Sequence, residues 1–246
     1  MELSNEILLV LLIFVAAILY SSVGHAGASG YLAAMALFGV APATMKPTAL
    51  ILNIFVATIA TYKFYRVGAF DWRVFLTFAL PAIPFAFLGG TIHLPTEIYK
   101  PVVGTILLLA ATRFLIGTKT VTADEVQRVP LWIAIPLGMF IGLLSGLTGV
   151  GGGIFLSPVL IFMNWAETRQ ASGISAMFIF VNSIAGLLGQ LSAIQAVPPQ
   201  IPFWAVAAVT GGLIGAELGS RRLGSPMIRR VLAIVLVVAG AKMVFV

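Results

Sequence analysis

Long runs of apolar residues fill most of this chain, and short groups of charged residues, prolines and glycines separate them. A transmembrane helix needs about 20 predominantly apolar residues, so the runs predict an all-α polytopic membrane protein with ten helices. The second and seventh runs are short, and the pattern leaves open whether they cross the membrane or form re-entrant hairpins. The predicted helices lie at residues 3–22, 28–41, 46–65, 73–92, 99–117, 130–147, 153–165, 169–192, 200–220 and 226–245.

The most polar stretch of the chain divides it almost in half, with five predicted helices on each side. We predict a first transmembrane repeat at 1–117, a cytoplasmic linker at 118–129 and a second transmembrane repeat at 130–246, within one integral membrane domain. An odd number of spans per unit turns the second unit upside down relative to the first. Such inverted-topology repeats are typical of secondary transporters, and the short broken helices are expected to meet near the membrane midplane.

Two glycine-rich interruptions stand at matching places in the two halves. Residues Gly24–Ser29 read GHAGAS, and residues Gly149–Ile154, 125 positions later, read GVGGGI. A break of this kind frees backbone N–H and C=O groups, which membrane proteins tolerate only beside protein or a water-filled cavity. A helix that begins at the break presents free N–H groups and a positive dipole end, which suits a small anion. The alternative is that the small residues only allow close helix packing.

The composition excludes several classes of protein. Only 9% of the 246 residues are charged and 60% are hydrophobic, whereas soluble domains carry roughly a quarter charged residues. The absence of cysteine excludes disulfides and cysteine-ligated metals. No paired intramembrane carboxylates, histidine-rich metal cluster or phosphate-binding Gly-Lys-Ser/Thr motif is present, so we expect no enzyme activity and no cofactor. The expected partners are the lipid bilayer and a small anionic substrate, not nucleic acid; homo-oligomerisation stays open.

The net charge of +6 does not indicate a nucleic-acid ligand, because Lys and Arg residues of a membrane protein mostly determine its orientation in the bilayer. With ten helices, eleven of the fourteen Lys and Arg residues fall on one side, and Lys46, Lys100 and Lys242 fall on the other. The side richer in positive charge is cytoplasmic in most membrane proteins. We therefore predict a multi-pass protein of the cell (inner) membrane with both termini on the extracytoplasmic side.

The candidate site residues lie in the two breaks and in the third predicted helix of each half, which contains scattered polar residues. The side chains nearest the breaks are mostly neutral hydroxyls, which can bind an oxyanion without holding it too tightly for release. His25 lies inside the first break, where it either assists anion binding or only packs. The candidate substrate-binding residues are Ser22, Gly24, His25, Gly27, Ser29, Asn53, Thr148, Gly151, Gly152, Gly153 and Ser175.

Three charged residues are candidates either for lining a vestibule of the transport pathway or for coupling transport to an ion. Lys46 and Arg169 occupy roughly matching turns, where they either attract anions to an entrance or only mark helix ends. Glu217 is the single acidic residue inside a predicted span, and an intramembrane carboxylate is a functional candidate by default. Its alternative is a structural ion pair with Arg221, four residues later on the same helical face.

The glycine-rich run of the second half also carries a family resemblance. Residues Thr148–Pro158, TGVGGGIFLSP, resemble the signature of the TauE/SafE family of sulfite exporters, as do the Gly-Ala-Phe-Asp-Trp turn at 68–72 and the overall length. The likeness covers essentially the whole chain. The first-half copy departs from the family pattern, with Ala and Ser at some glycine positions and His25 among them.

The resemblance implies export of a sulfur-containing anion across the cytoplasmic membrane. Together with the inverted repeat, it leads us to expect a secondary transporter that works by alternating access, with sulfite as its substrate. Two alternatives stay open: a transporter of sulfoacetate or another organosulfonate, and an anion channel of the same fold.

Overall fold

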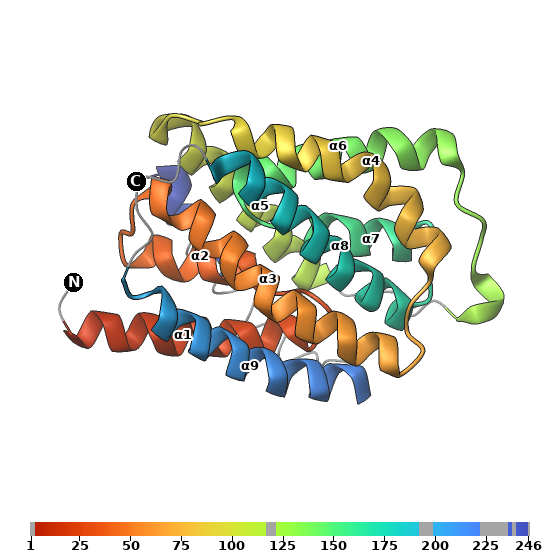
Figure 1. Cartoon of the computed structure of the whole chain (residues 1–246), viewed down its shortest axis with the longest axis horizontal. Helices are drawn as coiled ribbons and strands as arrows, with labels where there is room; N and C mark the ends of the chain where they lie inside the picture. The colour runs from red at the N-terminus through yellow and green to blue at the C-terminus, as the bar shows by residue number, and fades with distance from the viewer. Residues whose placement is uncertain (1–2, 117–121, 192–198, 222–235, 238–239, 246) are drawn as a thin grey trace.

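The computed structural model describes residues 3–116, 122–191, 199–221, 236–237 and 240–245. Within them all secondary structure is helical, which confirms the all-α class (Figure 1). A 3₁₀ turn, η1 (Ala123–Glu125), lies between the two halves. The α-helices are α1 (Leu3–Ser21), α2 (Ala28–Leu37), α3 (Pro42–Arg66), α4 (Trp72–Thr91), α5 (Thr96–Ile116), α6 (Leu131–Thr148), α7 (Gly153–Phe162), α8 (Thr168–Gln190) and α9 (Ile201–Arg221).

Six of these helices, α1, α3, α4, α6, α8 and α9, are long and apolar enough to cross a membrane. In contrast, α2 and α7 have ten residues each, which gives a length of about 15 Å at 1.5 Å per residue. The hydrocarbon core of a bilayer is about 30 Å thick, so neither short helix spans it alone. The predicted tenth helix, 226–245, lies mostly outside the described residues; positions 240–245 are helical.

The boundaries around the short helices differ from the predicted ones. The predicted helix 28–41 ends at Leu37 because Gly39 adopts a φ of 69°, and the N–H of Val40 returns to the carbonyl of Met35. The next helix begins at Pro42 rather than at residue 46. Proline suits the first turn because its fixed φ is helical and its missing N–H would have no partner there.

The seventh predicted helix, 153–165, ends early for the same reason. α7 stops at Phe162, and Asn164 takes a φ of 53°, the single positive φ of a non-glycine residue in the described chain. The N–H of Trp165 then bonds to the carbonyl of Leu160 at 2.8 Å. Asparagine is one of the few residues that adopt this left-handed conformation at low cost.

The halves pack through pairs of helices, with one helix of each pair from each half. α9 lies along α1, and α6 lies along α4. In Figure 1, α1, α3 and α9 run in one direction along the long axis, while α4, α6 and α8 run in the opposite direction. The third helices of the two halves, α3 and α8, cross in the centre of the bundle.

Glycines spaced four residues apart make both lengthwise contacts close. Cβ atoms at Gly211 and Gly215 of α9 would collide with the backbone carbonyls of Phe14 and Ile18 in α1. A Cβ at Gly142 of α6 would likewise collide with the carbonyl of Ala82 in α4. Small residues at this spacing allow backbones to approach within Cα–H···O contact, as is typical of helix pairs in membranes.

Five basic residues of the described chain gather at one end of the bundle, whereas Lys46, Lys100 and Lys242 do not. Lys63 and Arg66 lie in the last turn of α3, Arg73 in the first turn of α4, Arg169 at the start of α8 and Arg221 at the end of α9. These helix termini lie together at the right of Figure 1. The predicted one-sided distribution of charge is therefore present among the described residues.

Candidate functional site

The second break joins α6 to α7 through three glycines in the left-handed region. Gly149, Gly151 and Gly152 have φ values of 80°, 84° and 81°, which side chains with a Cβ rarely adopt. The first N–H within α7 to bond a backbone carbonyl is that of Phe155, which donates to Gly152 at 3.0 Å. The N–H groups of Gly153 and Ile154 come before it and are the usual free donors of a helix N-terminus.

Polar side chains from three helices surround the start of α7. The Asn53 Nδ2 atom of α3 lies 3.4 Å from the Val150 carbonyl. Ser145 of α6 and the backbone carbonyl of Ser175 in α8 lie against Gly152 and Gly153. Asn53, Ser145 and Ser175 are fully buried, and their Oδ1 or Oγ atoms have no hydrogen-bond partner among the described residues. Buried polar atoms are normally paired, so this cluster marks the candidate site.

The first break is built differently. Gly24 and Gly27 have φ values of 77° and 112°, and α2 begins directly afterwards. The ring of Tyr31 covers Gly27, and its hydroxyl donates to the Ala26 carbonyl at 2.6 Å. Gly27 of the first break is therefore covered by a side chain of its own segment, whereas Gly151 and Gly152 of the second break face side chains of other helices.

His25 connects the two breaks. Its Nε2 atom lies 2.9 Å from the hydroxyl of Ser157 and 3.2 Å from the backbone carbonyl of Gly153. Both partners belong to α7, about 130 residues away in sequence, and the imidazole is buried. The side chain of the first break therefore reaches the first turns of the helix that follows the second.

The backbone of the two segments recurs at a fixed spacing. Positive φ values appear at Gly24 and Gly149, at Gly27 and Gly152, and at Gly39 and Asn164, each pair 125 residues apart. Each break also packs on the start of the third helix of the other half. A Cβ at Gly24 would collide with Ser172, and one at Gly149 would lie 3.2 Å from the Cα atom of Lys46.

The structure divides the predicted substrate-binding residues into two groups. Ser22 and Ser29 are buried near the first break, and the Ser22 hydroxyl donates to its own helix at Leu19. Thr148 bonds to Leu144 in the same way. The residues of the second-break group are Asn53, Thr148, Gly151, Gly152, Gly153 and Ser175, with His25 reaching them from the first break; the first-break group is Ser22, Gly24, Gly27 and Ser29.

Lys46 and Arg169 differ sharply in their surroundings. Arg169 is exposed at the start of α8. The Lys46 side chain is buried, and its Nζ atom donates to the carbonyls of Gly89, Gly90 and Ile92 at 3.2–3.3 Å. Lys46 therefore caps the C-terminal end of α4, where a cation also suits the helix dipole.

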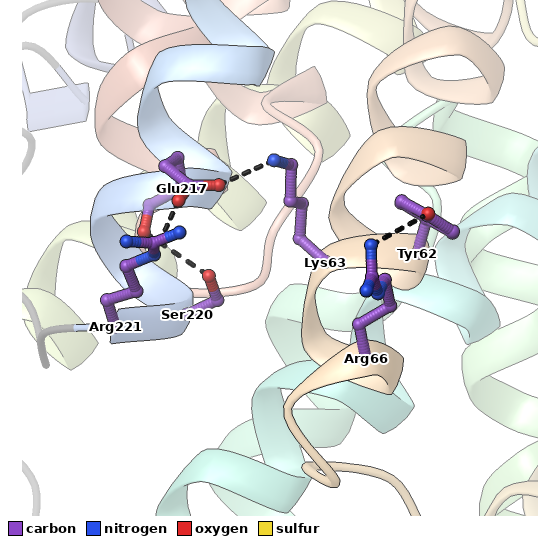
Figure 2. A network of polar contacts seen from close by, with 6 residues as sticks. All are labelled: Tyr62, Lys63, Arg66, Glu217, Ser220 and Arg221. Atoms are coloured by element: carbon purple, nitrogen blue, oxygen red, sulfur yellow. Dashed lines mark hydrogen bonds and ion pairs between the residues drawn. The ribbon is translucent and has the colours of Figure 1, made fainter.

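Glu217 lies in an ion-pair network at the basic end of the bundle, shown in Figure 2. Its carboxylate pairs with Arg221 at 2.5 Å, which is the predicted pair, and with Lys63 of α3 at 2.5 Å. Both partners of the Lys63 pair keep about a third of their side chain exposed. The network therefore joins helices of the two halves.

Four polar residues at the site escaped the sequence-based list. Ser145 and Ser157 lie within about one turn of the second break, so proximity to the glycines was a usable signal. Ser183 lies 3.4 Å from Asn53 Nδ2, and the Tyr99 hydroxyl donates to the Thr148 carbonyl at 3.1 Å. No local pattern indicates these last two contacts, since each joins distant parts of the chain.

Comparison with known proteins agrees with this architecture. The family described as sulfite exporter TauE/SafE matches residues 9–243. This chain belongs to the TauE/SafE family. A probable membrane transporter protein of Sinorhizobium fredii is 42% identical over 235 residues, covering 94% of this chain and 95% of that protein. No solved structure matches the chain.

More distant TauE/SafE relatives carry the same description. A probable membrane transporter protein of Methanocaldococcus jannaschii is 27% identical over 76% of this chain and 72% of its own length. Another, from Bacillus subtilis, is 24% identical over 90% of this chain and 92% of its own length. The protein is thus a multi-pass membrane transporter of the TauE/SafE family, a family of transporters rather than enzymes.

Proposed function

We propose that this TauE/SafE protein is a secondary transporter that exports a small sulfur-containing anion, sulfite above others, across the cell (inner) membrane. The observation that carries the proposal is the start of α7, where Asn53, Ser145 and Ser175 lie around a glycine-rich helix N-terminus and each has a buried polar atom without a described partner. This arrangement suits a small oxyanion, because N–H groups and hydroxyls donate to its oxygens and the helix dipole favours its charge.

The neutrality of the binding groups supports transport rather than permanent binding. Among the described residues, no ammonium or guanidinium group donates a hydrogen bond to the second break. Lys46 lies beside Gly149, but its ammonium group is directed at the end of α4. A site with a directly bound cation would hold its anion more firmly, whereas hydrogen bonds alone permit release. A cytoplasm-negative membrane potential also drives anions outward.

The mechanism we propose is alternating access between two inverted repeats, 1–117 and 130–246, joined by the linker. Three features support it. The breaks recur 125 residues apart, the fourth helix of each half packs on the first helix of the other half, and equivalent helices run in opposite directions in Figure 1. Equivalent units in opposite orientations can rock about a shared site. In this scheme His25 couples the movements of the two breaks.

The proposed orientation places the end that carries Lys63 and Arg221 in the cytoplasm and both termini outside. Because the natural chain has no cysteine, single cysteines report sidedness without background. A cysteine at Thr122 should react with a membrane-impermeant maleimide only after permeabilisation, and one at Thr96 should react in intact cells. The reverse result would invert the orientation and, with it, the direction of export.

Sulfite efflux from proteoliposomes tests the substrate and the site. We expect saturable efflux that Ser145→Ala, Ser175→Ala and Asn53→Ala each reduce at least about tenfold, the equivalent of about 1.4 kcal/mol. Thr58→Val, at an exposed hydroxyl of α3 that bonds only to its own helix, is the matched control and should transport normally. Normal efflux in all three site variants would move the site elsewhere.

The same preparation separates the alternatives. Stronger competition by sulfoacetate than by unlabelled sulfite would identify an organosulfonate transporter. Flux that does not saturate, together with unitary currents in bilayer recordings, would identify an anion channel and exclude alternating access.

A further inference from the structure

A groove lined by aromatic side chains lies at the basic end of the bundle. It has a volume of about 280 Å³ and lies between the last turns of α3, the start of α4 and the middle of α8. None of its lining residues belongs to the proposed site at the breaks. The walls of this aromatic groove include Tyr62, Tyr65, Phe70, Trp72, Met177 and Phe180.

The rings of the groove form a packed wall that is open on its outer side. Phe70 and Trp72 meet edge to face with their ring centroids 4.9 Å apart, and Tyr65 meets Trp72 at 6.4 Å. Tyr62, Tyr65 and Trp72 are nevertheless each about half exposed. Tyrosine and tryptophan gather where the hydrocarbon of a membrane meets water. Their position therefore places the groove at the level of the lipid headgroups.

The groove continues as an exposed stripe along α3 that has the length of one lipid leaflet. Phe55, Thr58, Tyr62 and Arg66 follow one another at intervals of three or four residues and are all exposed, so they share one face of the helix. At 1.5 Å per residue, Phe55 and Arg66 lie about 16 Å apart along the axis. This length is about half of the 30 Å hydrocarbon core. The face is thus mainly apolar at membrane depth and charged where one leaflet ends.

Arg66 is held beside the wall of the groove, as Figure 2 shows. Its Nη1 atom donates to the Tyr62 hydroxyl at 3.3 Å, and its guanidinium carbon lies 5.8 Å from the centroid of the Tyr62 ring. This hydrogen bond uses one of the five N–H donors of a guanidinium group, and the side chain is exposed. Arginine binds phosphate oxygens through paired N–H groups, so Arg66 retains donors for a phosphate.

The other charges close to the groove along the chain also favour an anion. Arg73 is exposed and follows Trp72 in the first turn of α4. Asp71 is the acidic residue between them and Arg66, and its carboxylate accepts hydrogen bonds from the N–H groups of Arg73 and Val74. Two arginines therefore stand beside one carboxylate that is already bonded to the backbone.

We propose that the aromatic groove is a specific site for one phospholipid with an anionic headgroup. The phosphate lies at Arg66 with Arg73 beside the headgroup, and one acyl chain lies in the groove and along the α3 face toward Phe55. Burial of the chain against the rings supplies affinity for a lipid, and the arginines supply the preference for an anionic headgroup. The orientation proposed above puts this lipid in the cytoplasmic leaflet, but its binding depends neither on that orientation nor on transport.

Lipid retention tests the headgroup preference. Protein purified in a mild detergent would be mixed with equal amounts of phosphatidylglycerol and phosphatidylcholine that carry the same acyl chains, and native mass spectrometry would count the bound lipids. We expect one phosphatidylglycerol to be retained preferentially, and Arg66→Gln to lower that preference about tenfold. The matched control is Arg128→Gln, which removes an exposed arginine of the linker outside the groove and should keep the preference. Thermal unfolding would establish that both variants are folded.

A photoactivatable acyl chain tests where the lipid lies. Phosphatidylglycerol with a diazirine in its chain would be crosslinked in proteoliposomes, and the labelled peptides would be mapped. Residues 55–72 and 177–180 should be labelled more than the exposed apolar face of α9 at Val206 and Leu213. Excess unlabelled phosphatidylglycerol should remove this labelling, and phosphatidylcholine should not. Equal labelling of the two regions, equal competition by the two lipids, or an unchanged preference in Arg66→Gln would each overturn the proposal and leave only ordinary contact with the bilayer.

Discussion

The Nε2 atom of His25 lies 2.9 Å from the Ser157 hydroxyl, so that a side chain from the first glycine-rich break is hydrogen-bonded inside the helix that follows the second. Both residues are buried. Because the contact crosses from one half of the chain to the other, any movement of the two halves must break it or carry both breaks together.

His25→Ala should impair both folding stability and transport. The substitution leaves the Ser157 hydroxyl without this partner and removes a buried ring, so we expect a loss of about 1–3 kcal/mol in unfolding free energy and a large fall in sulfite efflux. Denaturant titration in detergent and liposome efflux would measure the two effects. Ser157→Ala removes the same hydrogen bond but keeps the imidazole. If the hydrogen bond is what matters, the Ser157 variant should lose efflux as well; normal efflux there would assign the role to the ring itself.

Gly152→Asn should abolish transport, whereas Gly39→Asn should be tolerated. Both glycines have positive φ values, 81° and 69°, and asparagine adopts this conformation at modest cost. The difference is space: a Cβ at Gly152 would lie 2.9 Å from the Phe178 ring, while a Cβ at Gly39 has no described atom within 4 Å. Efflux rates and unfolding temperatures of the two variants would measure this difference. Similar losses in both would mean that backbone strain, not crowding at the site, governs the break.

Gly146→Ala should destabilise the bundle, and Gly186→Ala should not. A Cβ at Gly146 would collide with the Ala86 carbonyl, whereas one at Gly186 finds its closest atom at 3.4 Å, in ordinary contact. Overpacking costs about 1–3 kcal/mol, while replacing a helical glycine by alanine in open space gains about 0.5–1 kcal/mol. Thermal unfolding of the purified variants shows whether each substitution lowers or raises the stability. Equal destabilisation would show that the helix crossing is tighter than described.

Lys46→Met should lower stability far more than Arg169→Gln. The methionine fills similar space but removes the donors for three carbonyls at the end of α4, at an expected cost of about 1–3 kcal/mol. Arg169 is exposed, and its neutralisation should leave the unfolding temperature nearly unchanged. A stable Lys46→Met protein with impaired efflux would instead give Lys46 a direct role with the anion.

Separating Lys63 from Glu217 should slow transport, and exchanging the charges should restore it. Lys63→Glu and Glu217→Lys each place like charges together between α3 and α9, whereas the double variant recreates the pair. Efflux rates of the three variants, measured at low and at high salt, test this. Since both side chains are partly exposed, the defects should shrink as salt rises. A double variant no better than the single ones would show that Glu217 acts independently of Lys63.

Much of the fold was predictable because its causes are local. Apolar run length predicted nine described helices within a few residues of their observed bounds, and the glycine runs predicted both breaks. The errors at residues 38–41 and 163–165 arose because a left-handed residue ends a helix through a single dihedral angle, which apolar composition does not report. At the candidate site, Asn53 lies against Gly151, and both residues were named from the sequence. The Ser183 and Tyr99 contacts have no sequence signal.

The sequence by itself determined that the protein is a membrane protein, that its two halves carry matching breaks 125 residues apart, and that most of its basic residues fall on one side. The lengths of the apolar runs, the glycine clusters and the positions of the charges are all local features, so the sequence shows them directly. Only the tertiary structure decided that α9 lies on α1 and α6 on α4, that Lys46 caps α4, and that His25 reaches Ser157. These contacts depend on which helix faces fit together at close approach, and that fit involves residues up to about two hundred positions apart.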